Sequence, residues 1–174
     1  MKVLNLINPT TAGKVFRPTI RSTLATCLFS LAVALSVSAC ASEHVMQTLD
    51  EVKWGDAPPM LPAGAKIAVL SGNPGAEGLY TVRLKFPAHY GIPAHSHPKD
   101  EHVTVLRGTL FMGMADKLDT KSGKALPPGS FSITPTGVNH YAYTDSDEVI
   151  ILLHGMGPVD FKYVNPADDP RNKK

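Results

Sequence analysis

The sequence predicts an all-β domain, and three observations lead to that prediction. The 174-residue chain contains 15 proline and 14 glycine residues, which suit a fold of many turns and short strands. Short runs of alternating apolar and polar residues recur between Gly, Pro, Asp or Asn, and no helical period longer than about two turns competes with them. Eight such runs separated by turns predict a sandwich or a barrel.

The first 39 residues are predicted to be a signal peptide that lies outside this domain. Four basic residues, and no acidic ones, precede an apolar stretch from 24 to 39 that is rich in Leu, Ala, Val and Ser. A basic start, a short apolar middle and small residues at the end are typical of secretory signal peptides. The stretch is shorter than the ~20 residues that a membrane-spanning helix needs, so a retained membrane anchor is the less favoured alternative.

The end of this leader predicts a lipoprotein. Residues 37–40 read Val-Ser-Ala-Cys, which resembles the lipobox that bacterial lipoprotein signal peptidase cuts before its cysteine. Ordinary cleavage beside Ala39 or Ala41 is the alternative. Because Cys27 lies in the leader, Cys40 would otherwise be a lone thiol in an oxidising compartment, which favours lipidation. We therefore expect an exported protein of the periplasm. A lipid anchor at Cys40 would attach it to the outer membrane, and no other membrane contact is expected.

The remaining chain is slightly acidic. The whole sequence has 17 Lys and Arg against 15 Asp and Glu, a net charge of +2, and a pI near 8.5. Without the four basic residues of the leader, 13 Lys and Arg face 15 Asp and Glu, a net charge of −2. A domain of this charge has no electrostatic case for binding nucleic acid, so that class of partner is excluded.

Composition shifts divide the rest of the chain into three parts. Residues 40–62, with an acidic pair, Trp54 and two adjacent prolines, are predicted to form a tether and an arm that enters the domain. Residues 63–164 are predicted to form the barrel, and the polar tail 165–174 is expected to lie over its surface. The predicted strands are 66–70, 79–86, 101–106, 109–114, 130–134, 140–144, 149–153 and 159–164.

Four residues form a candidate metal site. His95 and His97 stand two residues apart, so in an extended strand both side chains project from one face. Glu101 shares a strand face with apolar residues, and coordination to a metal offsets the cost of burying its carboxylate. Residues 135–139 form a tight turn that delivers His140 at the start of another strand. Imidazole and carboxylate ligands suit Fe, Mn, Ni, Zn or Cu better than Ca. The alternative is that the histidines are ordinary surface residues of a loop.

The spacing of these residues resembles the two motifs of the cupin superfamily. His95, His97, Glu101 and Gly108 fit the first motif, and Gly129, Pro135, Gly137 and His140 fit the second. The sequence departs from the pattern at two positions: three residues instead of five separate Gly91 from His95, and Thr144 replaces a structural Asn. The resemblance is specific over 88–144 and extends plausibly over 63–164.

The resemblance implies a single-domain cupin, a double-stranded β-helix or jelly-roll barrel, with one divalent metal held by His95, His97, Glu101 and His140. It is closest to secreted or lipoprotein-type cupins of unassigned function. One or two free coordination positions would allow dioxygenase or isomerase chemistry on a small organic molecule. The alternatives are a non-catalytic periplasmic module that binds a metal or a small ligand, and a purely structural metal. No organic cofactor and no catalytic residue is assigned, and a homodimer is left open.

Other side chains are assigned by their strand face. Tyr80, Phe86, Phe111 and either Met112 or Met114 are expected to fill the barrel, whereas Tyr141 and Tyr143 are expected to pack on its outer face. His102 follows Glu101 directly and is therefore expected outside the barrel. His154 shares a face with Ile150 and Leu152, which makes it a candidate for the lining of the pocket.

Overall fold

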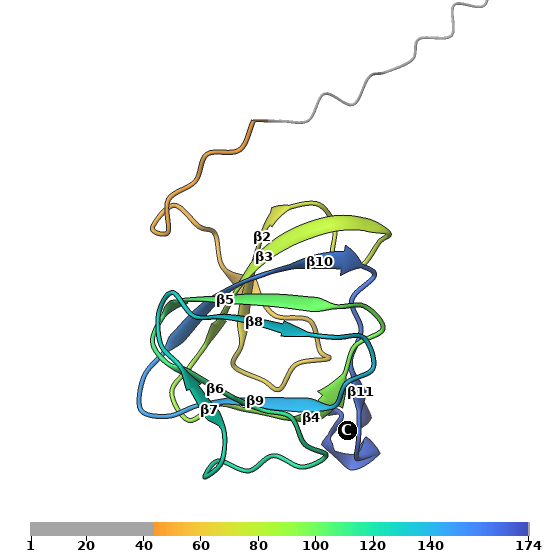
Figure 1. Ribbon diagram of the computed structural model, residues 1–174. Coiled ribbons are helices and arrows are strands. Elements are labelled where there is room, and N and C mark those ends of the chain that lie inside the picture. Colours follow the sequence, from red (N-terminus) through yellow and green to blue (C-terminus); the bar gives the residue numbers. More distant parts are fainter. Residues whose placement is uncertain (1–43, 174) are drawn as a thin grey trace, which may run out of the picture. The chain divides into compact units, whose positions relative to one another are not determined.

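The computed structural model describes residues 44–173, in which the strands form two antiparallel sheets that face each other (Figure 1). The six-stranded sheet has the order β1-β2-β3-β10-β5-β8 and the five-stranded sheet the order β11-β4-β9-β6-β7. The first sheet comprises β1 (Gly55–Asp56), β2 (Lys66–Ser71), β3 (Gly78–Phe86), β10 (Val149–Gly157), β5 (Glu101–Arg107) and β8 (Phe131–Thr134). The second comprises β11 (Lys162–Tyr163), β4 (Gly91–Ser96), β9 (His140–Thr144), β6 (Leu110–Gly113) and β7 (Lys124–Leu126).

The hydrophobic core lies between the two sheets. Strand β3 shows how the sequence builds it, because Tyr80 to Phe86 alternate between buried and half-exposed side chains along the strand. The inner faces of β5, β10, β6 and β9 contribute in the same way. The arm that precedes β2 adds Leu61 and Ala65 to this core, and Met60 packs against it. The arm therefore closes part of the space between the sheets.

The predicted all-β fold class is confirmed, and every predicted run contains a strand. Strand β4 was missing from the prediction because Pro93 interrupts its pattern. The register between β4 and β9 shifts between Ile92 and His95, so the proline stands at an irregularity of the ladder, where its missing N–H is tolerated. The two-residue β1 and the three-residue β7 were also missing from the prediction, because such short strands carry too few alternations to detect.

Two face assignments were wrong. Phe111 does not fill the barrel: it lies on the outer side of the five-stranded sheet, where its ring stacks on Tyr143 with centroids 4.8 Å apart. His154 does not line the interior, because its partner across the ladder is His102 on the outer face of the six-stranded sheet. The expected outer packing of Tyr141 and Tyr143 is confirmed, and both join a small outer cluster with Ala94.

Two motif positions have clear structural reasons. Gly108 has φ +70°, and a Cβ there would collide with the carbonyl oxygen of Glu148, so only glycine fits the turn after β5. Thr144, which stands where the motif has Asn, makes two hydrogen bonds through its side chain. Its hydroxyl accepts from the backbone N–H of Tyr90 at 2.8 Å and donates to the carbonyl of Pro87 at 2.7 Å.

The tail contains two short 3-10 turns, Pro166–Asp168 and Pro170–Asn172, capped by the side chains of Asn165 and Asp169. The predicted signal peptide and Cys40 lie outside the described residues. Within the part of the chain that is described, no helix has the length and apolar character needed to cross a bilayer.

Candidate metal centre

The four predicted ligands come from three strands that meet at one end of the barrel. His95 lies near the end of β4 and His97 directly after it, Glu101 begins β5, and His140 begins β9. Because β4 pairs with β9, His95 lies opposite His140 in the ladder. The pairing of the strands thus joins the two halves of the constellation, which are distant in sequence.

The three histidines form a compact buried group. One potential ligand atom from each of His95, His97 and His140 lies within 4.8 Å of the other two, and the residues are only 1–4% exposed. Among residues 44–173 this is the one group of at least three His, Cys, Asp or Glu side chains with such spacing. Three converging imidazoles can therefore share one ion.

Hydrogen bonds select the tautomer of each imidazole. The Nδ1 atoms lie near backbone carbonyl oxygens: 2.7 Å from Pro93 for His95, 2.9 Å from Asp160 for His97 and 3.3 Å from Val138 for His140. Since a carbonyl only accepts, this network assigns the proton of a neutral ring to Nδ1 and leaves a lone pair on Nε2. Such a backbone partner on the far nitrogen is the usual support of a metal-bound histidine.

Glu101 faces two of these Nε2 atoms. Its Oε1 lies 3.4 Å from Nε2 of His97, and its Oε2 lies 3.6 Å from Nε2 of His140. The Nε2 of His97 is buried without a hydrogen-bond partner among the described residues. Carboxylate oxygens and imidazole lone pairs are all acceptors, so a cation between them would satisfy both.

Protonation of the histidines is a poor way to satisfy the buried acceptors of this cluster. One carboxylate can compensate one buried imidazolium but not several. Burial, reinforced by the nearby His140 and His97, lowers the pKa of His95 to about 3. Burial would raise the pKa of Glu101, but the attraction of His97 and His140 outweighs it and holds that pKa below its usual range. The site thus combines a neutral imidazole at His95 with an ionised carboxylate, the forms that coordinate a metal.

Little space remains inside the barrel at the centre, although an open hollow of about 640 Å³ is lined by His97 and Asp160 on another side. One cavity of about 30 Å³ touches His95, Glu101 and His140, and another of about 40 Å³ touches Glu101 and Tyr80. Each volume is close to that of one or two water molecules. Phe161 borders both cavities, and its ring stacks on His95 with centroids 4.4 Å apart. The interior therefore admits an ion and water-sized ligands.

Two contributions to the centre were not predicted from the sequence: the carbonyl of Asp160 and the ring of Phe161. Both lie in the run 159–164, which was predicted as a strand without a functional role. Asp160 and Phe161 reach the site because β11, which follows them, pairs with β4 and places Tyr163 opposite His95. Only that pairing reveals their position.

Comparisons with known proteins agree with this architecture. The family model for the ChrR cupin-like domain matches residues 42–160. The germin-like protein subfamily 1 member 1 of Arabidopsis thaliana is 32% identical over 81 residues, which cover 45% of this chain and 37% of that protein. The match thus spans little more than a third of the length of the curated relative.

Two solved structures show the same fold. The polyketide cyclase RemF from Streptomyces resistomycificus superposes with a TM-score of 0.61 at 18% identity, over 74% of this chain and 90% of that chain. An RmlC-like cupin from Shewanella frigidimarina superposes with a TM-score of 0.50 at 21% identity, over 66% and 91% of the two chains. At these identities the likeness concerns the fold alone.

Proposed function

Since the chain belongs to the family of ChrR cupin-like domains, we propose that it is a metal-binding cupin that holds one divalent transition metal ion. The ligands are His95, His97 and His140 through Nε2, and Glu101 through its carboxylate. The observation that carries the proposal is the buried ring of acceptors, in which the carboxylate oxygens lie 3.4 and 3.6 Å from two imidazole nitrogens. A divalent cation would compensate the charge of the carboxylate and accept a lone pair from each of the four side chains.

The donor set limits the metal to a class. Imidazole with carboxylate suits Fe, Mn, Zn, Ni or Cu. When bound, such an ion supplies Lewis-acid chemistry, and a redox-active ion adds electron transfer. Four protein ligands leave about two positions free in an octahedral ion, which distinguishes the site from a closed structural one.

The surrounding residues favour a reaction on a small organic molecule, of the dioxygenase or isomerase type. Tyr80 and Glu101 are the polar side chains among otherwise apolar residues that line the larger of the two interior cavities. Burial, together with the charge of Glu101, raises the pKa of Tyr80 to about 12. Its hydroxyl therefore stays protonated at neutral pH and can donate to a ligand, while the apolar walls exclude bulk water.

A non-catalytic module that binds a metal or a small ligand in the periplasm is the second candidate, and the size of the cavities favours it. Spaces of about 30 and 40 Å³ hold little more than water. To enter either interior space, an organic substrate would have to displace Leu61 or Phe161, which border both spaces. A protein that only captures a metal would need no such movement.

Metal analysis and ligand access test these proposals together. We expect the purified wild-type protein to contain close to one equivalent of a transition metal, and a metal-free preparation to recover it on addition of Fe²⁺ or Zn²⁺. Nitric oxide should change the electron paramagnetic resonance spectrum of the iron-loaded protein, because free coordination positions remain. Absence of any stoichiometric metal would refute the metal site. Metal without a nitric oxide response would remove the dioxygenase and isomerase candidates.

We also propose that the protein is exported and anchored by lipid at Cys40. The basic and apolar leader and the residues Val-Ser-Ala-Cys at 37–40 support this. Expressed with its own leader, the wild-type chain should fractionate with membranes, and Cys40→Ser should abolish lipid attachment. Cys27→Ser is the matched control and should leave attachment unchanged. A fully soluble wild-type protein that begins at Ala41 or Ser42 would contradict the anchor.

A further inference from the structure

The segment from Asp160 to Tyr163 covers one side of the three histidines. Strand β11 within it pairs with the end of β4, with Lys162 opposite Ser96 and Tyr163 opposite His95. Phe161 stacks on the ring of His95 and meets the ring of His97 edge-on, with centroids 4.6 Å apart. The hydroxyl of Tyr163 donates to the carbonyl of Met60 at 2.7 Å, which ties the segment to the arm.

His97 differs from the other two histidines in how its ring is held. The carbonyl partners of His95 and His140 lie two residues earlier in the chain, at Pro93 and Val138. The carbonyl partner of His97 is Asp160, which lies 63 residues away in sequence. The orientation of His97 therefore depends on where the distant covering segment lies.

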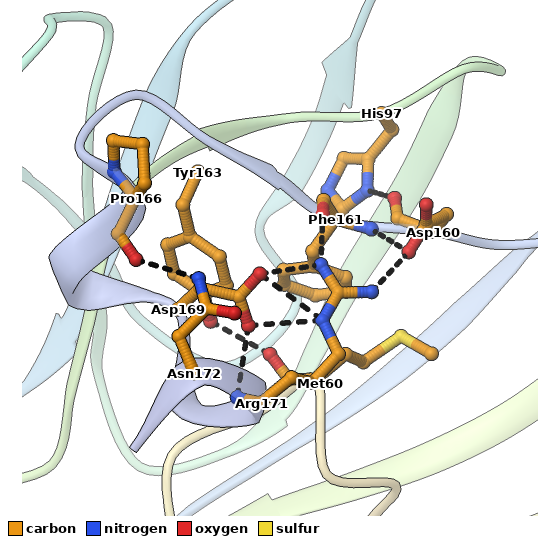
Figure 2. Close-up of polar contacts among 9 residues, drawn as sticks. All are labelled: Met60, His97, Asp160, Phe161, Tyr163, Pro166, Asp169, Arg171 and Asn172. Carbon is orange, nitrogen blue, oxygen red and sulfur yellow. Dashed lines mark hydrogen bonds and ion pairs between the residues drawn. The ribbon is translucent and has the colours of Figure 1, made fainter.

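Arg171 holds that segment from the C-terminal tail (Figure 2). Its Nη1 donates to Oδ1 of Asp160 at 2.8 Å, and its Nη2 donates to the carbonyl of Phe161 at 2.7 Å. The same Asp160 oxygen accepts from the backbone N–H of Phe161 at 2.8 Å. Asp169 orients the guanidinium through contacts of 2.8–3.1 Å with Nε and Nη2. The planar arginine fork thus fixes both residues that touch the metal centre.

We infer that Arg171 is a positioning residue of the metal centre. It sets the backbone at Asp160 and Phe161, so that the Asp160 carbonyl selects the Nδ1–H tautomer of His97 and the Phe161 ring covers the site. The inference rests on the proposed function, because the residue that Arg171 positions is a proposed ligand.

The exposure of Arg171 separates this role from a general contribution to stability. The side chains of Arg171 and Asp160 are 36% and 59% exposed, and an ion pair this exposed adds little to the free energy of unfolding; the pair with Asp169, which is 14% exposed, lies within the tail itself. Partners that orient a metal ligand, in contrast, typically change metal affinity by about 10–100-fold. Loss of Arg171 should therefore affect His97 more than the stability of the whole domain.

The experiment replaces Arg171 with Gln and uses Co²⁺ as the probe. We expect Arg171→Gln to weaken Co²⁺ binding by about 10-fold in competition with a chromophoric chelator, and to shift the visible spectrum of the bound ion. Arg171→Lys, which can reach only one of the two acceptors, should give an intermediate result. Arg107→Gln removes the same charge from an exposed position at the far end of β5 and should match the wild type.

A second measurement on the metal-free protein keeps the inference separate from the proposed function. Long-range proton–nitrogen correlation spectra of the imidazoles should show a mixed tautomer for His97 in Arg171→Gln, with His95 and His140 unchanged. If the wild type binds no Co²⁺, the proposed function fails while this measurement still judges Arg171. Unchanged affinity with unchanged His97 signals would overturn the inference, and so would equal changes at all three histidines. Should Arg171→Gln fail to fold, Arg171→Lys must show the same change confined to His97.

Discussion

Strand β5 begins with two residues that belong to very different histidine environments. Glu101 points into the barrel toward His97 and His140, whereas His102 points outward and lies beside His154, with ring centroids 4.9 Å apart. The inner group is buried, is held by backbone carbonyls and includes a carboxylate. The outer pair is only half-buried and packs near Phe131. Both groups thus bring imidazole rings close together. Only the inner group also combines burial, a fixed tautomer of each ring and a carboxylate that balances the charge.

The comparison suggests that a metal site needs all three of these properties. In water-exposed positions a histidine pair keeps its hydration and either tautomer, so little is gained by binding an ion. In the interior, the Nε2 of His97, which has no hydrogen-bond partner among the described residues, and the buried carboxylate of Glu101 make the metal-free site costly, and an ion would lower that cost. The experiments that follow test the difference from the largest expected effect to the smallest.

The largest effect should follow removal of an inner ligand. His140→Ala should lose most of the bound metal, because His140 supplies one of three converging nitrogens and is 1% exposed. Elemental analysis of the purified variant measures this directly, and His97→Ala should behave alike. If either variant keeps a full equivalent of metal, the ligand set is misassigned.

Acid should destabilise the metal-free protein through the inner group. The pKa of His95 is lowered from 6.5 to about 3, so between these values the unfolded chain binds a proton that the folded chain does not. Stability must then fall as the pH falls, by about 1.4 kcal/mol per pH unit for this one group. The lowered pKa of Glu101 has the same effect below about pH 4.5, where it also makes the free energy of unfolding fall as the pH falls.

Urea unfolding of metal-free protein at several values between pH 7.5 and 5 measures this slope. His95→Ala should flatten it even though the variant is less stable overall, and His102→Ala should leave the slope near that of the wild type. Equal slopes in the wild type and in His95→Ala would show that His95 is not held neutral by burial.

The smallest effect should follow removal of the outer pair. The double variant His102→Ala and His154→Ala should keep the metal content of the wild type and change the free energy of unfolding by less than about 1 kcal/mol, because both side chains are half-exposed. Metal titration monitored by mass spectrometry and thermal unfolding are the two measurements. A loss of the tightly bound ion would mean that the two faces of the sheet are coupled, contrary to the comparison.

Face assignments show where prediction from the sequence works and where it stops. Strand β3 alternates cleanly, so its inner residues Tyr80 to Phe86 were predicted correctly. Residues 149–153 are all apolar, so the pattern of β10 did not reveal its inner face and His154 became a candidate for the pocket lining. Where both sides of a strand are apolar, only pairing with neighbouring strands decides which side faces the core.

The sequence by itself determined the all-β fold class, the spacing of His95, His97, Glu101 and His140, and the outward position of His102, because alternation along a strand and the short distance between motif residues are local properties. The tertiary structure decided what supports these candidate ligands. Phe161 and the carbonyl of Asp160 reach His97 through the pairing of β11 with β4, and Arg171 reaches them through two short turns of the tail. Contacts of this kind depend on how distant segments meet, and no periodic pattern in the chain encodes them.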